Sequence, residues 1–165
     1  MAGRTVSKWF NFVVDDSAGT IRDIPVYTVS IVGVVYEEQD LTALADQVRG
    51  AMANMPTCPI EITGPFSTTA AVSASGTGVA AAYSGSHTVL EPISRTVITL
   101  TLDCQFGIQA LWATNMPQFG ISMVTGTTGY TCTAYTVDPA TMIYTCKFAL
   151  WPGSPLPAWG TAAET

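Results

Sequence analysis

Residues 7–66 carry the densest structural signals in the chain, and they read SKWFNFVVDDSAGTIRDIPVYTVSIVGVVYEEQDLTALADQVRGAMANMPTCPIEITGPF. Valines and aromatic residues dominate residues 6–14, a composition typical of a β-strand. The next residues, DDSAGT, favour a tight turn, because Asp and Ser side chains bond to nearby amides and Gly tolerates positive φ. A second extended, β-branched run follows from Ile24 to Val35. The chain therefore begins as a strand, a turn and a second strand.

The pattern then changes and predicts one amphipathic helix over residues 41–55. Asp40 is placed to cap its N-terminus, and Pro56 and Pro59 end it. Apolar residues recur at the spacing of a single helical face: Leu41, Leu44, Ala45, Val48, Met52 and Met55. Residues 60–66, IEITGPF, return to a strand pattern. We expect the helix to pack on a sheet through its apolar face.

This order of elements resembles the tail-tube (major tail) protein family of long-tailed bacteriophages. In that family a strand pair, an acidic turn, one helix and a strand with Gly-Pro-Phe or Gly-Phe recur. The resemblance covers Ser7 to Phe66, and less specifically the strand patterns at residues 130–135 and 142–148. It implies a virion structural protein that assembles with itself into stacked hexameric rings, which form a DNA conduit. It implies no catalytic, cofactor-binding or metal-ligating residue.

The rest of the chain predicts a mainly β fold, a β-sandwich or barrel, in a single domain of residues 1–165. Further strands are predicted over residues 95–106, 130–137 and 142–151, with Asp138-Pro-Ala as a tight turn between the last two. Residues 68–94 are rich in Gly, Ser and Ala, and we expect an extended loop or an arm that orders on a neighbouring subunit. The Pro-rich tail, residues 152–165, is predicted to be irregular.

Composition points to self-association. Charged residues make up 11% of the chain and its mean hydropathy is +0.33. A surface with so few charges favours burial against further copies of the chain or other virion proteins. Every apolar run is shorter than the roughly 20 residues that span a bilayer, so no membrane partner is predicted. The N-terminus also lacks a secretory signal pattern, and we expect assembly in a host cytoplasm before incorporation in a virion.

The charge pattern argues against direct DNA binding. The formal net charge is −6, and the six cations are scattered. Binding to DNA needs several clustered phosphate contacts. A neutral or acidic wall could instead enclose DNA without holding it.

Residues with reactive side chains form no catalytic motif. Cys58, Cys104, Cys132 and Cys146 lack C-x-x-C spacing, and the only histidine, His87, lies far from them in sequence, which argues against a zinc site. Buried thiols are the first interpretation, and a disulfide between facing strands is the second.

The acidic doublets Asp15-Asp16 and Glu37-Glu38 make no acid–base pair, because adjacent strand residues point to opposite faces. No nucleophile elbow, phosphate-binding loop or zinc-protease motif occurs, so the sequence predicts a non-enzyme.

Two other functions fit a β-rich chain of this composition. One is a capsid decoration or cement protein that forms trimers on a phage head. The other is a carbohydrate-binding β-sandwich, which would need exposed aromatic residues gathered in one loop. The helix predicted after the second strand favours the tail tube.

Overall fold

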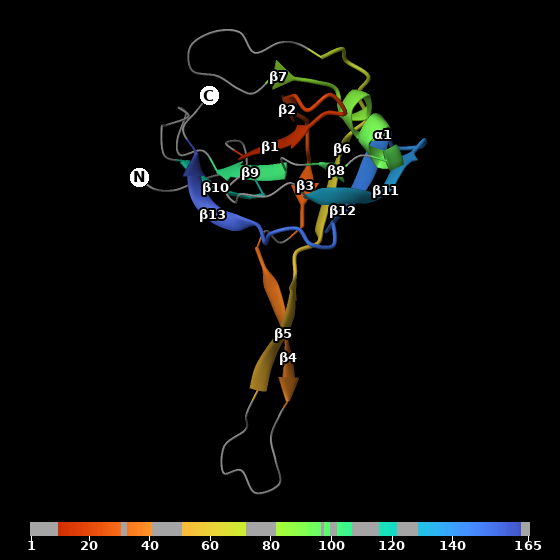
Figure 1. Cartoon of the computed structure of the whole chain (residues 1–165). Helices are drawn as coiled ribbons and strands as arrows, with labels where there is room; N and C mark the ends of the chain where they lie inside the picture. Colours follow the sequence, from red (N-terminus) through yellow and green to blue (C-terminus); the bar gives the residue numbers. More distant parts are fainter. Residues whose placement is uncertain are drawn as a thin grey trace, which may run out of the picture.

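The computed structural model describes residues 10–30, 33–40, 51–71, 82–96, 98–99, 102–106, 116–121 and 129–162. Within these residues the fold is mainly β with one helix, as the sequence predicts. Figure 1 shows a body that contains two larger sheets, from which one hairpin projects.

The two larger sheets are almost entirely antiparallel. The six-stranded sheet has the order β13-β10-β9-β1-β2-β7 and contains β1 (Phe10–Asp15), β2 (Ile21–Asp23), β7 (Ala82–Tyr83), β9 (Leu102–Phe106), β10 (Met116–Gly120) and β13 (Ala158–Ala162). The five-stranded sheet has the order β3-β6-β12-β11-β8 and contains β3 (Thr28–Val29), β6 (Ile60–Pro65), β8 (Ile98–Thr99), β11 (Tyr130–Asp138) and β12 (Ile143–Leu150). Only β2 and β7, among the described strand pairs, run in parallel. The third sheet is a hairpin of β4 (Val35–Asp40) and β5 (Ala51–Thr57), which we call the arm.

One hydrophobic core receives side chains from both larger sheets. The six-stranded sheet contributes Phe12, Val14, Leu102, Cys104 and Phe119, and the five-stranded sheet contributes Ile60, Ile62, Tyr130, Tyr144, Cys146 and Phe148. Along β6 and β12 the core residues alternate with less buried ones, as expected when one face of a sheet is covered. The strands predicted at residues 60–66, 130–137 and 142–151 are therefore confirmed. The single strand predicted over 95–106 is wrong in extent: α1 reaches Thr96, and two strands in different sheets, β8 and β9, follow it.

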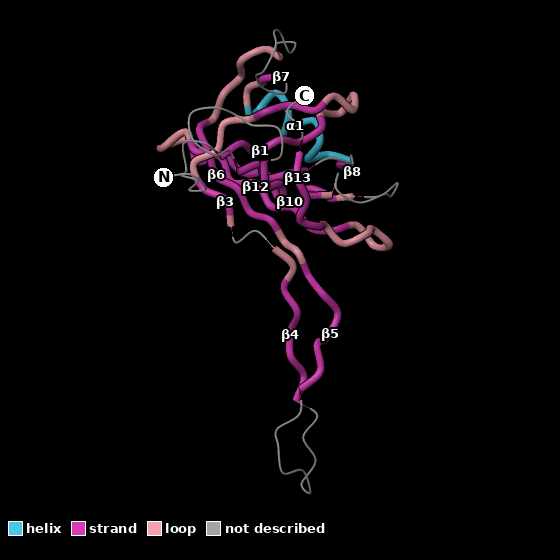
Figure 2. Tube along the Cα trace, turned by 90° about the vertical axis from the view of Figure 1, so that its left-hand side faces the viewer, coloured by secondary structure: helices cyan, strands magenta, loops and turns pink. Residues whose placement is uncertain are grey.

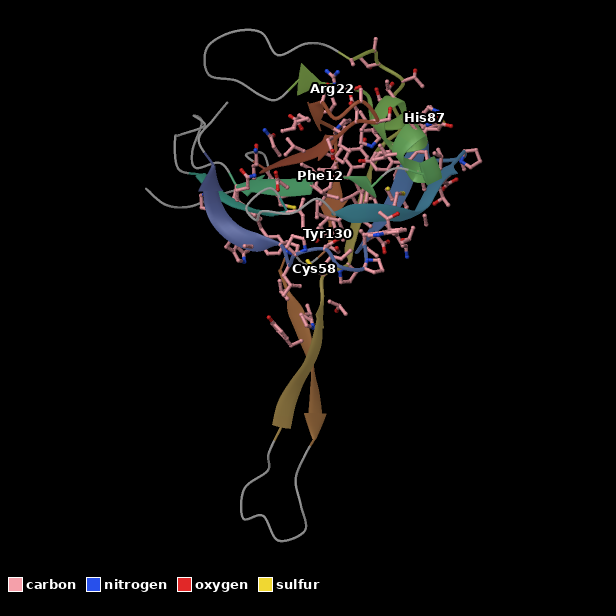
Figure 3. All side chains as sticks on the ribbon, in the orientation of Figure 1. Phe12, Arg22, Cys58, His87 and Tyr130 are labelled. Carbon is pink, nitrogen blue, oxygen red and sulfur yellow. The ribbon has the colours of Figure 1, made fainter. Side chains whose placement is uncertain are left out.

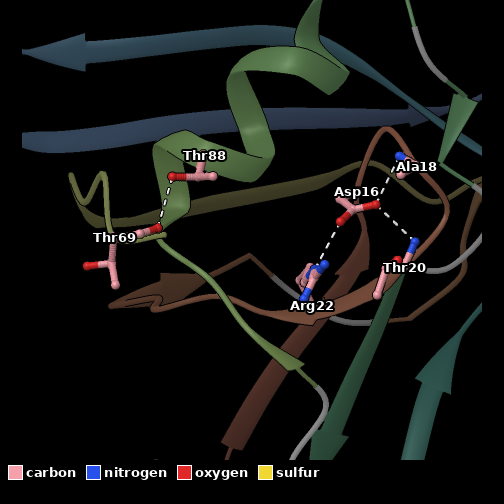
Figure 4. Close-up of polar contacts among 6 residues, drawn as sticks. All are labelled: Asp16, Ala18, Thr20, Arg22, Thr69 and Thr88. Carbon is pink, nitrogen blue, oxygen red and sulfur yellow. Dashed lines mark hydrogen bonds and ion pairs between the residues drawn. The ribbon is translucent and has the colours of Figure 1, made fainter. Parts of the chain in front are cut away.

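Both predicted acidic turns are present. The Asp16 carboxylate accepts hydrogen bonds from the amides of Ala18 and Thr20, each at 2.9 Å (Figure 4). Gly19, within this turn, has φ +80°. In the second turn, the Asp138 carboxylate accepts from the Ala140 amide at 2.9 Å. These side-chain bonds replace ladder bonds that the chain loses where it reverses.

The prediction of a helix over residues 41–55 is wrong for residues 51–55, the part that the structure describes. Residues 51–57 form β5, and Asp40, the predicted N-cap, is the last residue of β4. Residues 41–50 lie outside the described residues. Ala and Met favour helix in isolation, but antiparallel pairing with β4 satisfies the backbone of this segment. Cross-strand pairing has overridden intrinsic propensity here.

The observed helix, α1 (Ser86–Thr96), lies mostly in the segment predicted to be a loop over residues 68–94, so that prediction is wrong there. Three apolar residues at helical spacing bury its inner face in the core: Val89, Leu90 and Ile93. The helix forms in spite of Pro92, whose ring removes one backbone donor from its interior. Burial of this apolar face offsets the weak local propensity.

Residues 65–69 make hydrogen bonds to the first turn of α1. The Ser86 hydroxyl donates to the Pro65 carbonyl at 2.7 Å and accepts from the Ser67 amide at 3.1 Å. The Thr88 hydroxyl donates to the Thr69 carbonyl at 3.0 Å (Figure 4). These bonds orient α1 against the end of β6.

The tail predicted to be irregular over residues 152–165 contains a strand, so this prediction is wrong for β13. The prolines of the tail end at Pro157, and every residue of Ala158–Ala162 has an amide that can join a ladder. β13 pairs with β10 and forms one edge of the six-stranded sheet. Residues 163–165 lie outside the described residues.

Candidate assembly interface

The arm projects from the body of the protein as an extended hairpin (Figure 1). Figures 1 and 2, which differ by a quarter turn, both show β4 and β5 extending away from the two larger sheets. Among the described strands, β4 and β5 pair with each other and with no strand of the body. An isolated two-stranded ribbon is marginally stable in water, and the described strands of the body add no sheet pairing that would stabilise the arm.

A buried hydrogen-bond chain fixes the root of the arm. The Cys58 thiol donates to the Gly33 carbonyl at 3.2 Å, and the Tyr130 hydroxyl donates to the Cys58 sulfur at 3.1 Å. Tyr130 is fully buried and Cys58 is 3% exposed, and Figure 3 shows both where the arm meets the body. Gly33 has φ +148°, a backbone conformation that favours glycine. The two chain segments that enter the arm are thus tied to the core.

Both side chains in this hydrogen-bond chain stay protonated at neutral pH. Burial raises the pKa of the Cys58 thiol, and burial also raises the pKa of the Tyr130 hydroxyl. A protonated, buried thiol is a poor nucleophile. Cys58 and Tyr130 therefore serve here as hydrogen-bonding groups that stabilise the base of the arm.

Exposed apolar side chains lie on the segment that enters the arm. Tyr27 is 65% exposed, and Val35 and Tyr36 are each 50% exposed. Val35 and Tyr36 pair with Thr57 and Pro56 in the first rungs of the arm. Val35 and Tyr36 thus expose two adjacent large apolar side chains at the base of the arm, where another protein can cover them.

The edge strand β13 provides a second candidate surface. Trp159 is 57% exposed, although its ring lies 5.1 Å from Phe119 and 5.6 Å from Phe106 between ring centroids. One side of β13 faces β10, and its other side has no partner strand among the described residues. An edge strand beside an exposed aromatic ring can accept a strand from a neighbouring copy.

Two cationic side chains are described in full, and both contact carboxylates. Arg22 Nε lies 2.9 Å from Asp16 Oδ2, and Lys147 Nζ lies 3.0 Å from Glu61 Oε2. Burial would raise the pKa of Asp16, but bonds from the Thr20 amide and Arg22 hold it below its usual value. These described cations do not form a patch that could bind phosphates.

The remaining reactive residues are dispersed among structural contacts. His87 Nδ1 lies 2.9 Å from the Tyr135 hydroxyl, and its ring is tilted by 44° against Phe66 with 4.8 Å between ring centroids. Asp15 is buried in β1 and Asp16 holds the following turn, so the doublet is not a paired carboxylate site. The side chains of the other doublet, Glu37-Glu38, lie outside the described residues.

The thiol interpretation of the cysteines agrees with the structure. All four are free, and Cys58, Cys104 and Cys146 are buried, while Cys132 is partly buried. Across the described residues, no group of three or more His, Cys, Asp or Glu side chains could hold a metal ion. Nor does the described part of the chain contain a helix long and apolar enough to cross a membrane.

Solved structures provide a match over nearly the full chain. The fold is similar to a chain from the PVC sheath-tube complex of an extracellular contractile injection system in its extended state, with TM-score 0.54 and 10% identity, covering 97% of this chain and 93% of that chain. A chain from the PVC sheath/tube terminator is also similar, with TM-score 0.51 and 10% identity over 94% of this chain and 96% of that one. Both neighbours belong to tube-type assemblies. No protein-family model matches the sequence, and no curated protein matches it.

Sequence reasoning missed both candidate surfaces. The Ala and Met residues of 51–55 favour a helix, so the strand β5 of the arm was not predicted. The prolines that precede β13 favour irregular structure, so β13 was not predicted either. One signal for the arm does exist, since Val34-Val35-Tyr36 before it and Pro56 after it are unusual flanks for a helix.

Proposed function

We propose that the chain is a structural subunit of a tube, in which copies associate side by side into rings and the rings stack. The likeness that covers more than nine-tenths of both chains, to a component of a sheath-tube complex, supports this proposal most strongly. Because the match covers 97% of this chain, it extends well beyond any single hairpin.

The two candidate surfaces suit such an assembly. The arm extends from one region of the body, and the β13 edge lies on the six-stranded sheet away from the five-stranded sheet that carries β6 and β12 (Figure 1). Two different surfaces on one subunit allow head-to-tail contacts, which close into rings when the rotation between copies closes. In this proposal the arm docks on a neighbouring copy and buries Tyr27, Val35 and Tyr36.

The finer features of the proposal follow from the resemblance to phage tail-tube proteins and from charge. We propose sixfold rings with a central channel that lets DNA pass without gripping it. The net charge of −6 and the carboxylate partners of Arg22 and Lys147 support a wall with little attraction for a polyanion. The subunit has no enzymatic role in this proposal, and its place is a virion or a virion-like particle.

Truncation of the arm tests the proposal. The variant replaces residues 36–56 with Asn-Gly, which closes a two-residue hairpin directly on the Val35–Thr57 pair, where the Thr57 amide can donate across the turn. We expect a folded protein with nearly unchanged thermal stability that no longer forms large assemblies in size-exclusion chromatography with light scattering. The matched control is Met142→Asn, which removes a 50% exposed apolar side chain from a different hairpin at a positive-φ position that Asn tolerates.

The control should assemble like the original chain. Assembly of the truncated variant to the same size would contradict the role of the arm. A stable trimer of the full chain would favour a capsid decoration protein instead.

A further inference from the structure

The five-stranded sheet contains a pair of thiols in contact. Cys132 lies on β11 and Cys146 on the adjacent strand β12, and their sulfurs are 3.4 Å apart. Cys132 is opposite Phe148 in the register, and a β-bulge between Cys132 and Ala134 shifts the pairing before Cys146 meets Tyr135. The two cysteines therefore lie diagonally across β11 and β12 with the bulge between them, and their sulfurs are in contact.

The two thiols differ in access and in acidity. Cys146 is fully buried, whereas Cys132 is partly exposed. A hydrogen bond from Cys146 lowers the pKa of the Cys132 thiol, and the same contact raises the pKa of the Cys146 thiol. Cys132 is therefore the thiol that solvent reaches and the one that ionises first. Cys146 lies beside it and can attack the Cys132 sulfur after Cys132 has reacted.

We propose that Cys132 and Cys146 form a redox-closable dithiol, which a small-molecule disulfide such as glutathione disulfide converts to a covalent bridge between β11 and β12. The proposal concerns a modification site within one subunit and does not depend on the tube assembly.

The chemistry balances with that oxidant. The Cys132 thiolate attacks one sulfur of the small disulfide, forms a mixed disulfide and releases one small-molecule thiolate, which takes up a proton. Cys146 loses its proton and attacks the Cys132 sulfur, which releases the second small-molecule thiol. The protein loses two protons and two electrons, which together are two hydrogen atoms, and the small disulfide takes them up to become two thiols.

The other cysteines lack this arrangement. Cys104 is fully buried, and burial raises the pKa of its thiol to about 12. The Cys58 thiol is 3% exposed and accepts from the Tyr130 hydroxyl in the arm-root hydrogen-bond chain. Oxidation of the folded protein should therefore select Cys132 and Cys146.

The experiment exposes the folded full-length chain to glutathione disulfide and measures intact mass without reduction. We expect the loss of two hydrogen atoms with no retained glutathione. Chymotrypsin cuts after Tyr135 and Tyr144 and so separates the two cysteines, and the expected linked peptides join the Cys132 segment to the Cys146 segment. Cys146→Ser should retain glutathione on Cys132, and Cys132→Ser should resist modification.

A control variant, Cys58→Ala, keeps the dithiol and should still close. The wild-type mass and peptide map decide the outcome even where a variant folds poorly. An unmodified wild-type chain, a lasting glutathione adduct without a bridge, or a bridge that includes Cys58 or Cys104 would each overturn the proposal.

Discussion

Gly64 lies where the five-stranded sheet leaves no space for a side chain. It pairs with Tyr144 across β6 and β12, and the buried Tyr144 hydroxyl donates to the Pro25 carbonyl at 2.8 Å. A Cβ atom at position 64 would lie 2.5 Å from the Pro25 carbonyl oxygen and 2.8 Å from both Cε1 and the hydroxyl oxygen of Tyr144. Gly64→Ala must therefore move backbone at Pro25 or a large buried ring.

The expected cost combines two effects. Overpacking of a buried site costs about 1–3 kcal/mol. Displacement of the Tyr144 hydroxyl leaves a polar pair without its bond, which costs about 1–3 kcal/mol more. We expect Gly64→Ala to lower the free energy of unfolding by about 3 kcal/mol. Tyr144→Phe alone should cost about 1 kcal/mol, because it removes the bond and leaves the ring in place.

The assay is urea unfolding of the two single variants and the double variant. Because both changes disrupt the Tyr144–Pro25 bond, the double variant should lose at least about 1 kcal/mol less than the sum of the single losses. The matched control is Tyr27→Phe, at a 65% exposed tyrosine, where we expect a change within about 0.5 kcal/mol. A loss below about 0.5 kcal/mol for Gly64→Ala, or strictly additive losses, would refute this account of the contact.

Three further outcomes test the packing and electrostatics of the body. Leu90→Ala should lower the free energy of unfolding by about 2–5 kcal/mol in urea, because Leu90 is fully buried on α1, and a smaller loss would place this face outside the core. Burial raises the pKa of Asp23 to about 6, so the folded state favours the protonated carboxyl, and this contribution to stability is lost as pH rises from about 4 to about 6. Asp23→Asn should therefore raise Tm at pH 7.5 and have little effect on Tm at pH 4. An equal change in Tm at both pH values would contradict the pKa shift. Lys147→Ala should change stability by less than about 1 kcal/mol, since both members of its ion pair with Glu61 are about half exposed, and a larger loss at high salt would show a role beyond this pair.

The sequence predicts those elements whose local signals and burial agree. The alternating pattern of Tyr144, Cys146 and Phe148 matches a strand with one covered face, and the structure confirms it. The turn at Asp16 follows from its side-chain chemistry, because the carboxylate bonds to amides only a few residues away. Such elements need no information about distant parts of the chain.

Elements that depend on distant contacts could not be predicted in this way. α1 contains Pro92 and begins in a Ser- and Gly-rich segment, yet it forms because Leu90 reaches the core and because residues 65–69 bond to its first turn. β5 carries a helical composition and becomes a strand by pairing with β4. The candidate surfaces lie on such elements, so the local pattern located neither the arm nor the β13 edge.

Negative-stain electron microscopy of the purified full-length chain tests the central proposal most directly, because it separates stacked rings from compact particles. The proposal predicts rings with a central channel, and short tubes at higher protein concentration, while the arm-truncated variant remains in small particles. Compact trimers or monomers of the full chain at every concentration, with no ring in any class average, would contradict it.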